Sequence, residues 1–481
     1  MKKTAKKIPQ SAQQDRAQSL PAEDAPRALD PHGPSVAERM EAGKALRARH
    51  PRTAHAEWKR PAQRQDPVAM LQASDAERLP ELIPIRYGRM LQSPFAFFRG
   101  SAAVMAADLS ATPATGLRVQ ACGDCHLANF GGFATPERNI IFDINDFDET
   151  LPAPWEWDVK RLAASFVLAA RSIGLSDGKG RDAAVSVVRA YRKRVREFAE
   201  MHPLEVWYAR ITAEDVLAMV PAARVPLLRA RIDKALSGSG SEFDFPKLAG
   251  VVGGRTSIRD TPPLIFHPDL ARSKQFDEIL NQVFAAYRET LSDDRRVLLD
   301  RYRVVDAAIK VVGVGSVGRR CWIVLMMSAS NDPLFLQFKE AAASVLEPFA
   351  GASAYGHHGQ RVVAGQRLMQ PASDLFLGWV TAANGKQFYV RQLRDAKIKP
   401  LIETFDDELL ELYARICGWS LARAHAKSSD VAGIAGYLGS GDAFDDAVGN
   451  FAVAYADQAE RDHAVLKAAV RRGAVTVHLE S

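Results

Sequence analysis

The residues of this chain with the clearest chemical potential lie close together, between Cys122 and Glu149. Cys122, Cys125 and His126 have the spacing C-x-x-C-H, which is the attachment motif of c-type haem. Haem attachment of that kind requires export, and we expect no export signal in this chain. The two thiols also suit a redox pair or a metal site, although zinc needs four ligands and no clear fourth ligand presents itself.

A third interpretation of the same segment is phosphoryl transfer. Asp124 is followed by Asn129 in a loop after a predicted strand, and Asp146 and Asp148 end the next predicted strand. In this chemistry one carboxylate accepts the proton of the attacking hydroxyl, while an amide and a second carboxylate hold the Mg²⁺ that bridges ATP phosphates. The same residue types also form ordinary turns, so the segment alone leaves all three interpretations open.

A glycine-rich segment favours the third interpretation. Gly313, Gly315 and Gly318 form G-x-G-x-x-G around Ser316, between two strand-like runs. A dinucleotide-binding motif of this form should open a helix. Strand, glycine loop and strand is instead the kinase arrangement, in which backbone amides lie over the ATP phosphates.

Lys339 follows at the end of the next strand-like run, where a kinase lysine contacts the α- and β-phosphates. Either Glu340 or Glu347 is expected as its carboxylate partner. If one metal–triphosphate unit touches all these groups, Lys339 must lie within about 12 Å of Asp146.

The elements that position these residues can be read from the hydrophobic pattern. Residues 117–121 and 139–146 are strand-like, and residues 155–167 have helical spacing. Residues 305–340 are β-rich, and an Asn384-Gly385 turn predicts a hairpin between two further strands. Apolar spacing from Leu409 to Trp419 predicts a C-terminal helix.

Composition indicates a soluble globular protein: 481 residues, 47% hydrophobic, 25% charged. No apolar run approaches the roughly 20 residues that span a bilayer, and four cysteines make no disulfide scaffold. We therefore expect a cytoplasmic protein with no membrane contact. Residues 1–64 hold 14 Lys and Arg against 7 Asp and Glu, whereas the whole chain has a net charge of +6. This basic segment predicts a disordered tail, the only part expected to touch nucleic acid, and its removal should leave the core intact.

The motifs GDCHLANFG and FDINDFDE resemble those of aminoglycoside and choline phosphotransferases, which have a protein-kinase-like fold. The resemblance implies that Asp124 is the catalytic base and that Asn129 and Asp146 hold metal. It also implies that Asp158 supports the catalytic loop. In those enzymes the glycine loop and lysine precede the catalytic loop, whereas here they follow it. A circular permutation is therefore implied, with the helix LARAHAKS taking the place of the helix before the catalytic loop.

Over residues 79–438 the chain is more closely similar to the bacterial family called domain of unknown function 2252. The stretches that carry this likeness include SPFAFFRGSAAVMAADL, VGVGSVGRRCWIVLM and YVRQLRDAK. The family supplies no substrate, so the acceptor is an unknown small molecule or protein. A non-catalytic nucleotide-binding or interaction module is the alternative function.

The combined prediction is a two-lobed, circularly permuted, kinase-like α+β fold. It uses ATP and Mg²⁺, with Gly313, Gly315, Ser316, Gly318 and Lys339 binding the nucleotide. The predicted segments are a disordered basic tail (1–65), a mainly helical lobe with the catalytic-loop motif (79–240), a connecting region (241–304), a β-rich lobe with the glycine loop and lysine (305–400), and C-terminal helices packing on the helical lobe (401–481).

Overall fold

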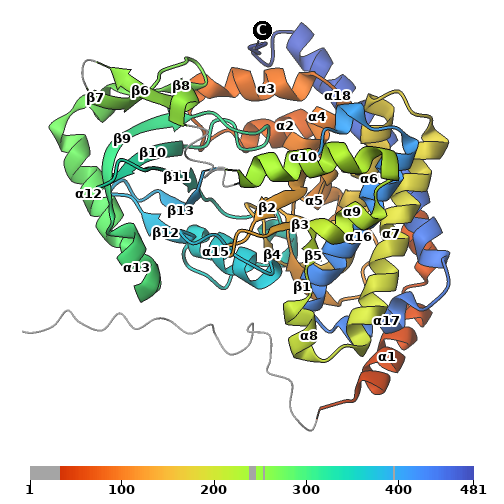
Figure 1. Cartoon of the computed structure of the whole chain (residues 1–481). Coiled ribbons are helices and arrows are strands. Elements are labelled where there is room, and N and C mark those ends of the chain that lie inside the picture. Colours follow the sequence, from red (N-terminus) through yellow and green to blue (C-terminus); the bar gives the residue numbers. More distant parts are fainter. Residues whose placement is uncertain (1–32, 238–244, 253–254, 394–395, 481) are drawn as a thin grey trace, which may run out of the picture. The chain divides into compact units, whose positions relative to one another are not determined.

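The computed structural model describes residues 33–237, 245–252, 255–393 and 396–480, so most of the predicted tail lies outside the described residues. Residues 34–481 form one compact unit. Within it, a β-sheet with its own helices lies beside a group of long helices, as Figure 1 shows. The coarse prediction of a mixed α+β fold is confirmed.

The larger sheet contains six antiparallel strands, in the order β12 (Gly378–Thr381), β13 (Gln387–Gln392), β11 (Pro333–Glu340), β10 (Cys321–Ser328), β9 (Tyr302–Lys310) and β8 (Ile265–Phe266). Aromatic and β-branched side chains favour these extended segments, and β10 and β11 are buried along most of their length. The predicted hairpin at Asn384-Gly385 joins β12 to β13, with Gly385 at a φ of 77°.

The segment predicted as a connecting region belongs to the core of this β-rich part. Its helix α12 (Lys274–Arg288) packs on the sheet through aromatic side chains. The rings of Phe276 and Trp322 lie 5.3 Å apart, and those of Phe284 and Phe338 lie 5.2 Å apart. The segment also contains α13 (Asp293–Leu299) and the hairpin of β6 (Ala249–Val252) and β7 (Arg255–Ile258). It is therefore part of the β-rich part and not a connection between lobes.

The long helices form the second part of the unit. They are α6 (Trp155–Ser172), α7 (Asp177–Glu200), α16 (Asp407–Ala426) and α18 (Ala443–Arg471). The central helix α6 is buried on nearly every side, and its Trp155 ring stacks on Tyr191 of α7 at 5.8 Å. The helices α16 and α18 both pack on α7 and α6. In the described part of the chain, none of the helices combines enough length with enough apolar character to cross a membrane.

Short elements connect the two parts and hold the loops of interest. The strand β1 (Arg118–Ala121) pairs with β4 (Leu151–Pro154), and β2 (Phe130–Ala134) pairs with β3 (Ile140–Ile144), which also pairs with β5 (Ile211–Thr212). The remaining helices are α1 (Val36–Ala45), α2 (Pro67–Ala73), α3 (Ile83–Leu91), α4 (Pro94–Gly100), α5 (Ala102–Ser110), α8 (Pro203–Tyr208), α9 (Ala213–Met219), α10 (Val225–Leu236), α14 (Glu347–Ala350), α15 (His358–Met369) and α17 (Val431–Leu438).

The prediction of a disordered tail up to residue 65 is wrong for residues 36–64. The helix α1 packs on α17, and two arginines after it cap the end of α17. Arg47 donates to the carbonyl of Tyr437 at 2.8 Å, and Arg52 donates to that of Leu438 at 2.6 Å. The last carbonyls of a helix have no partner within the helix. Side chains that sequence composition assigns to a solvated tail therefore satisfy buried backbone groups.

Two glycines allow this helix contact. A Cβ on Gly436 would lie 1.9 Å from the carbonyl oxygen of Met40, and one on Gly43 would lie 2.0 Å from that of Gly433. We predict that Gly436→Ala lowers the free energy of unfolding by about 1–3 kcal/mol because α1 must move away. Helix propensity alone would raise it by up to about 1 kcal/mol, so the sign of the change is informative. Urea denaturation measures it.

Gly178, in α7, is the matched control for this prediction. A Cβ there would meet only the Ser176 hydroxyl, at 3.8 Å. We expect Gly178→Ala to leave stability unchanged or slightly raised. If Gly436→Ala behaves in the same way, α1 does not pack on α17 as described.

Candidate active site

The loop that follows β1 carries Asp124 and Asn129 and is fixed by Asp158 at the start of α6. The carboxylate of Asp158 accepts hydrogen bonds from the N–H of Cys122 at 2.7 Å and from the N–H of Gly123 at 3.1 Å. The side-chain amide of Asn129 donates to the carbonyl of Asp124 at 2.8 Å, which closes the loop and leaves the Asn129 side-chain oxygen for another partner. The expected contact between Asp158 and this loop is confirmed.

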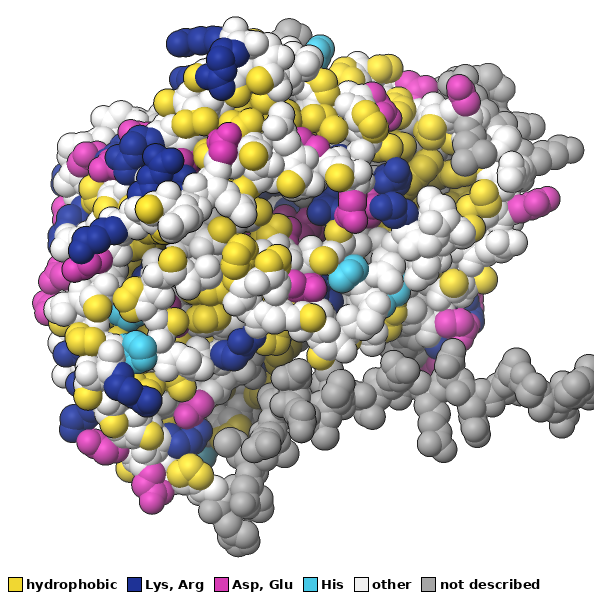
Figure 2. Space-filling model, turned by 180° about the vertical axis from the view of Figure 1, so that it is seen from behind, with side chains coloured by type: hydrophobic (Ala, Val, Ile, Leu, Met, Phe, Trp, Pro, Cys, Tyr) yellow, Lys and Arg dark blue, Asp and Glu magenta, His cyan; other side chains and the backbone are white. Residues whose placement is uncertain are grey.

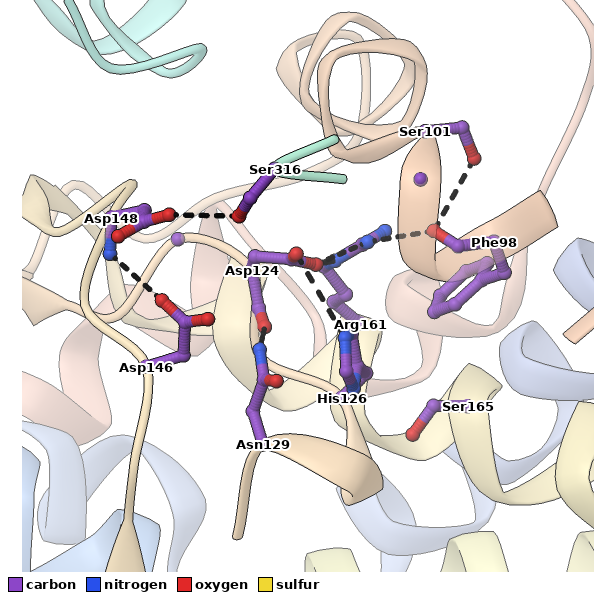
Figure 3. Close-up of polar contacts among 12 residues, drawn as sticks. Phe98, Ser101, Asp124, His126, Asn129, Asp146, Asp148, Arg161, Ser165 and Ser316 are labelled. Carbon is purple, nitrogen blue, oxygen red and sulfur yellow. Dashed lines mark hydrogen bonds and ion pairs between the residues drawn. The ribbon is translucent and has the colours of Figure 1, made fainter. Parts of the chain in front are cut away.

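Asp146 and Asp148 follow β3, next to this loop. The N–H of Asn145 donates to the carbonyl of Asn129 at 2.7 Å, so the two loops leave the β2–β3 hairpin side by side. Asp124, Asn129 and Asp146 consequently line one pocket. Figure 3 shows these residues around Asp124.

Lys339 reaches the two aspartates from β11. Its Nζ lies 3.8 Å from Oδ2 of Asp146 and forms a closer ion pair with Asp148. The other oxygen of Asp148 accepts a hydrogen bond from the Tyr389 hydroxyl at 2.7 Å. The predicted proximity of Lys339 and Asp146 is confirmed. The Lys339 side chain is only 3% exposed and lies behind the aspartates, not on the pocket wall.

Mutual charges determine the protonation of this group. Burial opposes the charge on Lys339, but Asp146 and Asp148 raise its pKa. Burial also opposes the charge on Asp148, but Lys339 and Tyr389 lower its pKa to about 2. Burial and the neighbouring Asp148 raise the pKa of Asp146. Asp148 is thus the ion-pair partner of the lysine, whereas Asp146 is the carboxylate that a bound cation would stabilise.

The expectation that Glu340 or Glu347 pairs with Lys339 is wrong. Successive side chains of a strand point to opposite faces, so Glu340 faces away from Lys339, and its Oε2 accepts from the backbone N–H of Arg320 at 3.0 Å. Glu347 accepts from the N–H of Ser344 at 3.1 Å. Two aspartates from the loop after β3 occupy the place predicted for a glutamate.

The glycine loop joins β9 to β10, as the strand–loop–strand pattern predicts. Gly313 and Gly318 adopt φ angles of 70° and 88°, which favour glycine. The Ser316 hydroxyl donates to Oδ2 of Asp148 at 3.2 Å, which joins the loop to the acidic residues (Figure 3). Gly313, Gly315 and Ser316 line the pocket, whereas Gly318 lies outside it.

The outer side of this loop is held by residues around α3. Arg78 donates to the carbonyl of Val317 at 2.5 Å, and the N–H of Leu79 donates to the carbonyl of Gly318 at 2.8 Å. Arg89 donates to the carbonyl of Gly313 at 2.5 Å. The acceptors in these hydrogen bonds are carbonyl oxygens of the glycine loop, so the contacts hold the loop over the pocket.

The pocket has a volume of about 110 Å³ and a mixed charge. Seen from behind, the molecule is hollowed near the middle of the face, and both acidic and basic side chains lie within the hollow (Figure 2). The charged residues that line the pocket are Asp124, Asp146, Asp148, Glu149, Arg78, Arg86, Arg99 and Arg319. Sequence reasoning missed all four arginines, although Arg99 immediately precedes a Gly-Ser pair, at the end of α4.

Asp124 is paired with an arginine that sequence reasoning also missed. Arg161 of α6 donates through Nε to Oδ1 of Asp124 at 2.8 Å and through Nη2 to the carbonyl of Phe98 at 2.9 Å. The Asp124 side chain is 23% exposed. Burial raises its pKa, against the opposing effect of Arg161. The signal in the sequence was the spacing of Asp158 and Arg161, which places both on the face of α6 toward the loop.

The two cysteines belong to the loop and are buried. Donor atoms of Cys122, Cys125 and Asp158 lie within 4.8 Å of one another. Burial raises the pKa of both thiols, to about 11 for Cys125, so both are protonated at neutral pH. Cys122 and His126 also line the pocket. A metal held by the cysteines would therefore need a ligand from outside this group of three.

Comparison with known proteins gives one match. A family model described as "Uncharacterized protein conserved in bacteria (DUF2252)" matches residues 78–469. Neither the curated proteins nor the solved structures contain a match to the chain.

Proposed function

The chain belongs to the DUF2252 family of uncharacterized bacterial proteins, and we propose that it is a kinase-like phosphotransferase that uses Mg²⁺ and ATP. The observation that carries the proposal is the contact of Lys339 with Asp146 and Asp148, which are far away in the sequence. Phosphoryl transfer requires a lysine, a metal carboxylate, a glycine loop and a base around one triphosphate. The pocket and the lysine behind it supply this set.

The residues present fit a magnesium ion. Asp146 offers a carboxylate whose charge is not neutralised as fully as that of Asp148. Asn129 offers its side-chain oxygen, because its NH₂ group is bound to Asp124. Oxygen donors of this kind suit Mg²⁺. When held by Asn129 and Asp146, the ion would offset the negative charge of the phosphates.

The remaining residues have roles in the transfer step. Gly313, Gly315 and Ser316, which line the pocket, bind the triphosphate, and Lys339 holds Asp146 and Asp148 from behind. Asp124 accepts the proton of the acceptor hydroxyl as the hydroxyl oxygen bonds to the γ-phosphorus. The bond from the γ-phosphorus to the β–γ bridging oxygen breaks, and ADP leaves with that electron pair. The acceptor is a small molecule or a protein.

The order of elements in the β-rich part supports a kinase-like lobe. A glycine loop lies between β9 and β10, and Lys339 lies on the following strand, as in protein kinases. The helix α15 and the hairpin β12–β13 complete the lobe. One departure is that α15 brings no carboxylate to Lys339: its sequence, HGQRVVAGQRLM, contains no acidic residue.

The position of α16 supports a circular permutation. Its end lies beside β1, the strand that leads to Asp124: the N–H of Gln120 donates to the Ser428 hydroxyl at 3.0 Å. His425 of α16 lies 3.2 Å from the carboxylate of Asp158, which fixes the same loop. The helix LARAHAKS thus stands next to the catalytic-loop motif in space, although it follows that motif by about 300 residues in the sequence.

A non-catalytic nucleotide-binding module is the second candidate function. It is favoured by the ion pair of Arg161 with Asp124, because an arginine stabilises the carboxylate and weakens it as a base. ATP consumption by the purified protein distinguishes the two functions, since only the enzyme consumes ATP.

We predict that Mg²⁺ with ATP raises the melting temperature by a degree or more and that Asp146→Asn removes this increase. A ligand stabilises a protein through its affinity for the folded state, and the substitution removes one metal ligand. The measurement is a thermal shift with ATP in the presence and absence of Mg²⁺. Asp177→Asn is the control, because Asp177 pairs with Arg171 on the surface and is 64% exposed.

The same assay should depend on pH. Because the pKa of Asp146 is raised, its protonation competes with the metal as the pH falls. The increase in melting temperature caused by Mg²⁺ and ATP should therefore be larger at pH 7.5 than at pH 5. If Mg²⁺ and ATP raised the melting temperatures of Asp146→Asn and the native protein equally, Asp146 would not be a metal ligand.

A further inference from the structure

Arg99 is a cation on the pocket wall that forms no ion pair with the described residues. It lies at the end of α4 and lines the pocket together with Asp124. Among the described residues it takes part in no ion pair, and its buried Nε has no hydrogen-bond partner. Its guanidinium carbon lies 5.9 Å from the centroid of the Phe95 ring. Asp124 and Asp146 are its nearest carboxylates, but neither forms an ion pair with it, so its N–H groups are left to bind an anion in the pocket.

Two further arginines make this end of the pocket basic. Arg86 is 2% exposed and its Nε has no partner among the described residues, although its other nitrogens bind Asp75 and the Gly100 carbonyl. Arg319 has one ion pair, a loose contact of 3.7 Å with the exposed Glu77. Both line the same pocket. We call these two residues and Arg99 the basic end.

The start of α5 adds backbone donors to the basic end. Ala102 and Ala103, the first residues of this nine-residue helix, line the pocket, and the helix has no side-chain cap. The Ser101 hydroxyl donates instead to the carbonyl of Phe98 at 3.3 Å. The first N–H groups of a helix have no partner within the helix and carry a partial positive charge.

Of the three arginines, Arg99 lies across Asp124 from Asp146 and Asp148, whereas Arg319 follows the glycine loop, where its N–H donates to the carbonyl of Ser316 at 3.1 Å. In Figure 3, Asp146 and Asp148 lie on one side of Asp124, and Phe98 and Ser101, which flank Arg99, lie on the other. Arg161 fixes this spacing by binding both Asp124 and the carbonyl of Phe98. A group bound to Arg99 is therefore on the opposite side of Asp124 from Asp146 and Asp148.

We propose that the basic end binds an oxyanion of the acceptor, so that the acceptor is an anionic hydroxyl compound carrying a phosphate or carboxylate group. The inference rests on the proposed function, which puts the acceptor hydroxyl at Asp124. Arg99 forms an ion pair with the oxyanion, and Arg319 and the N–H groups at the start of α5 donate further hydrogen bonds to it. The hydroxyl of the same molecule then points to Asp124.

Inorganic phosphate is the probe, titrated calorimetrically into the full chain saturated with Mg²⁺ and a non-hydrolysable ATP analogue. We expect the native protein to bind phosphate and Arg99→Gln to weaken phosphate binding by about tenfold or more, since a charge-assisted hydrogen bond is lost. Arg99→Lys should restore part of the affinity. Affinity for the analogue should change by less than about twofold. Arg181→Gln is the control, because Arg181 is partly exposed and pairs with Asp446 on the surface.

The outcomes separate this inference from the proposed function. Two results would assign Arg99 to the nucleotide and overturn the inference. One is that phosphate competes with the ATP analogue for binding. The other is that Arg99→Gln weakens binding of the analogue instead of binding of phosphate. Absence of phosphate binding would also overturn it. Binding of phosphate through Arg99 without any nucleotide binding would overturn the proposed function and leave the oxyanion site standing. If Arg99→Gln fails to fold, Arg319→Gln is measured in its place, with the same expected direction.

Discussion

Replacing Asp124 with asparagine is expected to lower the rate of ATP consumption by about 10²- to 10⁴-fold, the usual contribution of a general base. Asparagine has the same shape and still accepts a hydrogen bond from Arg161, but it cannot take a proton from the acceptor. Stabilisation by Mg²⁺ and ATP should persist, because the proposed metal and nucleotide contacts involve Asp146, Asn129 and the glycine loop instead. The rate of ADP release measures the first effect, and a thermal shift measures the second.

Asp177→Asn controls for the loss of an aspartate paired with an arginine, because Arg171 contacts Asp177 at 2.8 Å on the surface. Its rate should equal that of the native protein. Unchanged ATP consumption in Asp124→Asn would rule out Asp124 as the base. A protein that binds Mg²⁺ and ATP but consumes no ATP, before or after the substitution, would favour the non-catalytic module.

The local parts of the site were predictable from the sequence because they depend on short spacings. Asp124 and Asn129 lie five residues apart on one loop, and the strand–glycine loop–strand pattern was visible in alternating apolar runs. The partner of Lys339 was not predictable in this way. Asp148 approaches from another sheet, through a contact that no spacing encodes, whereas the sequence neighbour Glu340 points to the opposite face.

Asp143 and Asp146 show how a shift of three residues changes the role of an aspartate. Both lie in the acidic run at the end of β3, and sequence alone does not separate them. Asp143 lies within the strand and is fully buried, with Arg423 at 2.5 Å and the Ser420 hydroxyl at 2.5 Å. Asp146 lies beyond the strand end and reaches the pocket. The point at which the strand ends, which hydrophobic patterns locate poorly, decides between core and site.

The start of the folded core could not be predicted from the sequence, because amino-acid composition carries no information on tertiary contacts. Residues 36–64 are rich in arginine and alanine and resemble a solvated tail. Their arginines nevertheless bind groups in the C-terminal helices, and α1 approaches α17 through glycines, which carry no hydrophobic signal. The contacts are made with residues nearly 400 positions away in the sequence, as for Arg64 and Asp462.

Arg64→Met is expected to lower the free energy of unfolding by about 3–5 kcal/mol, the range measured when one partner of a buried ion pair is removed. The Arg64 side chain is 4% exposed and lies between two buried carboxylates, 2.7 Å from Asp108 and 2.6 Å from Asp462. Methionine fills a similar volume but leaves both carboxylates without a cation. Urea denaturation at neutral pH measures the loss.

The dependence of this loss on pH tests its electrostatic cause. Burial already raises the pKa of Asp108, against the effect of Arg64, so removing Arg64 raises it further. Protonation then relieves the unpaired charge as the pH falls. The difference in stability between the native protein and Arg64→Met should therefore be smaller at pH 5 than at pH 8.

Arg60→Met, an exposed position four residues earlier, is the matched control and should change stability by no more than about 0.5 kcal/mol. Deletion of residues 1–33, which precede α1 and make none of the contacts described above, should leave the melting temperature within about a degree of the native value, whereas deletion of residues 1–64 should lower it by several degrees. An Arg64→Met protein as stable as Arg60→Met, or equal stability of the two truncated chains, would mean that the folded core begins after residue 64. The bound carboxylates argue against that result, because Asp108 and Asp462 would then be buried side by side without the cation that joins them.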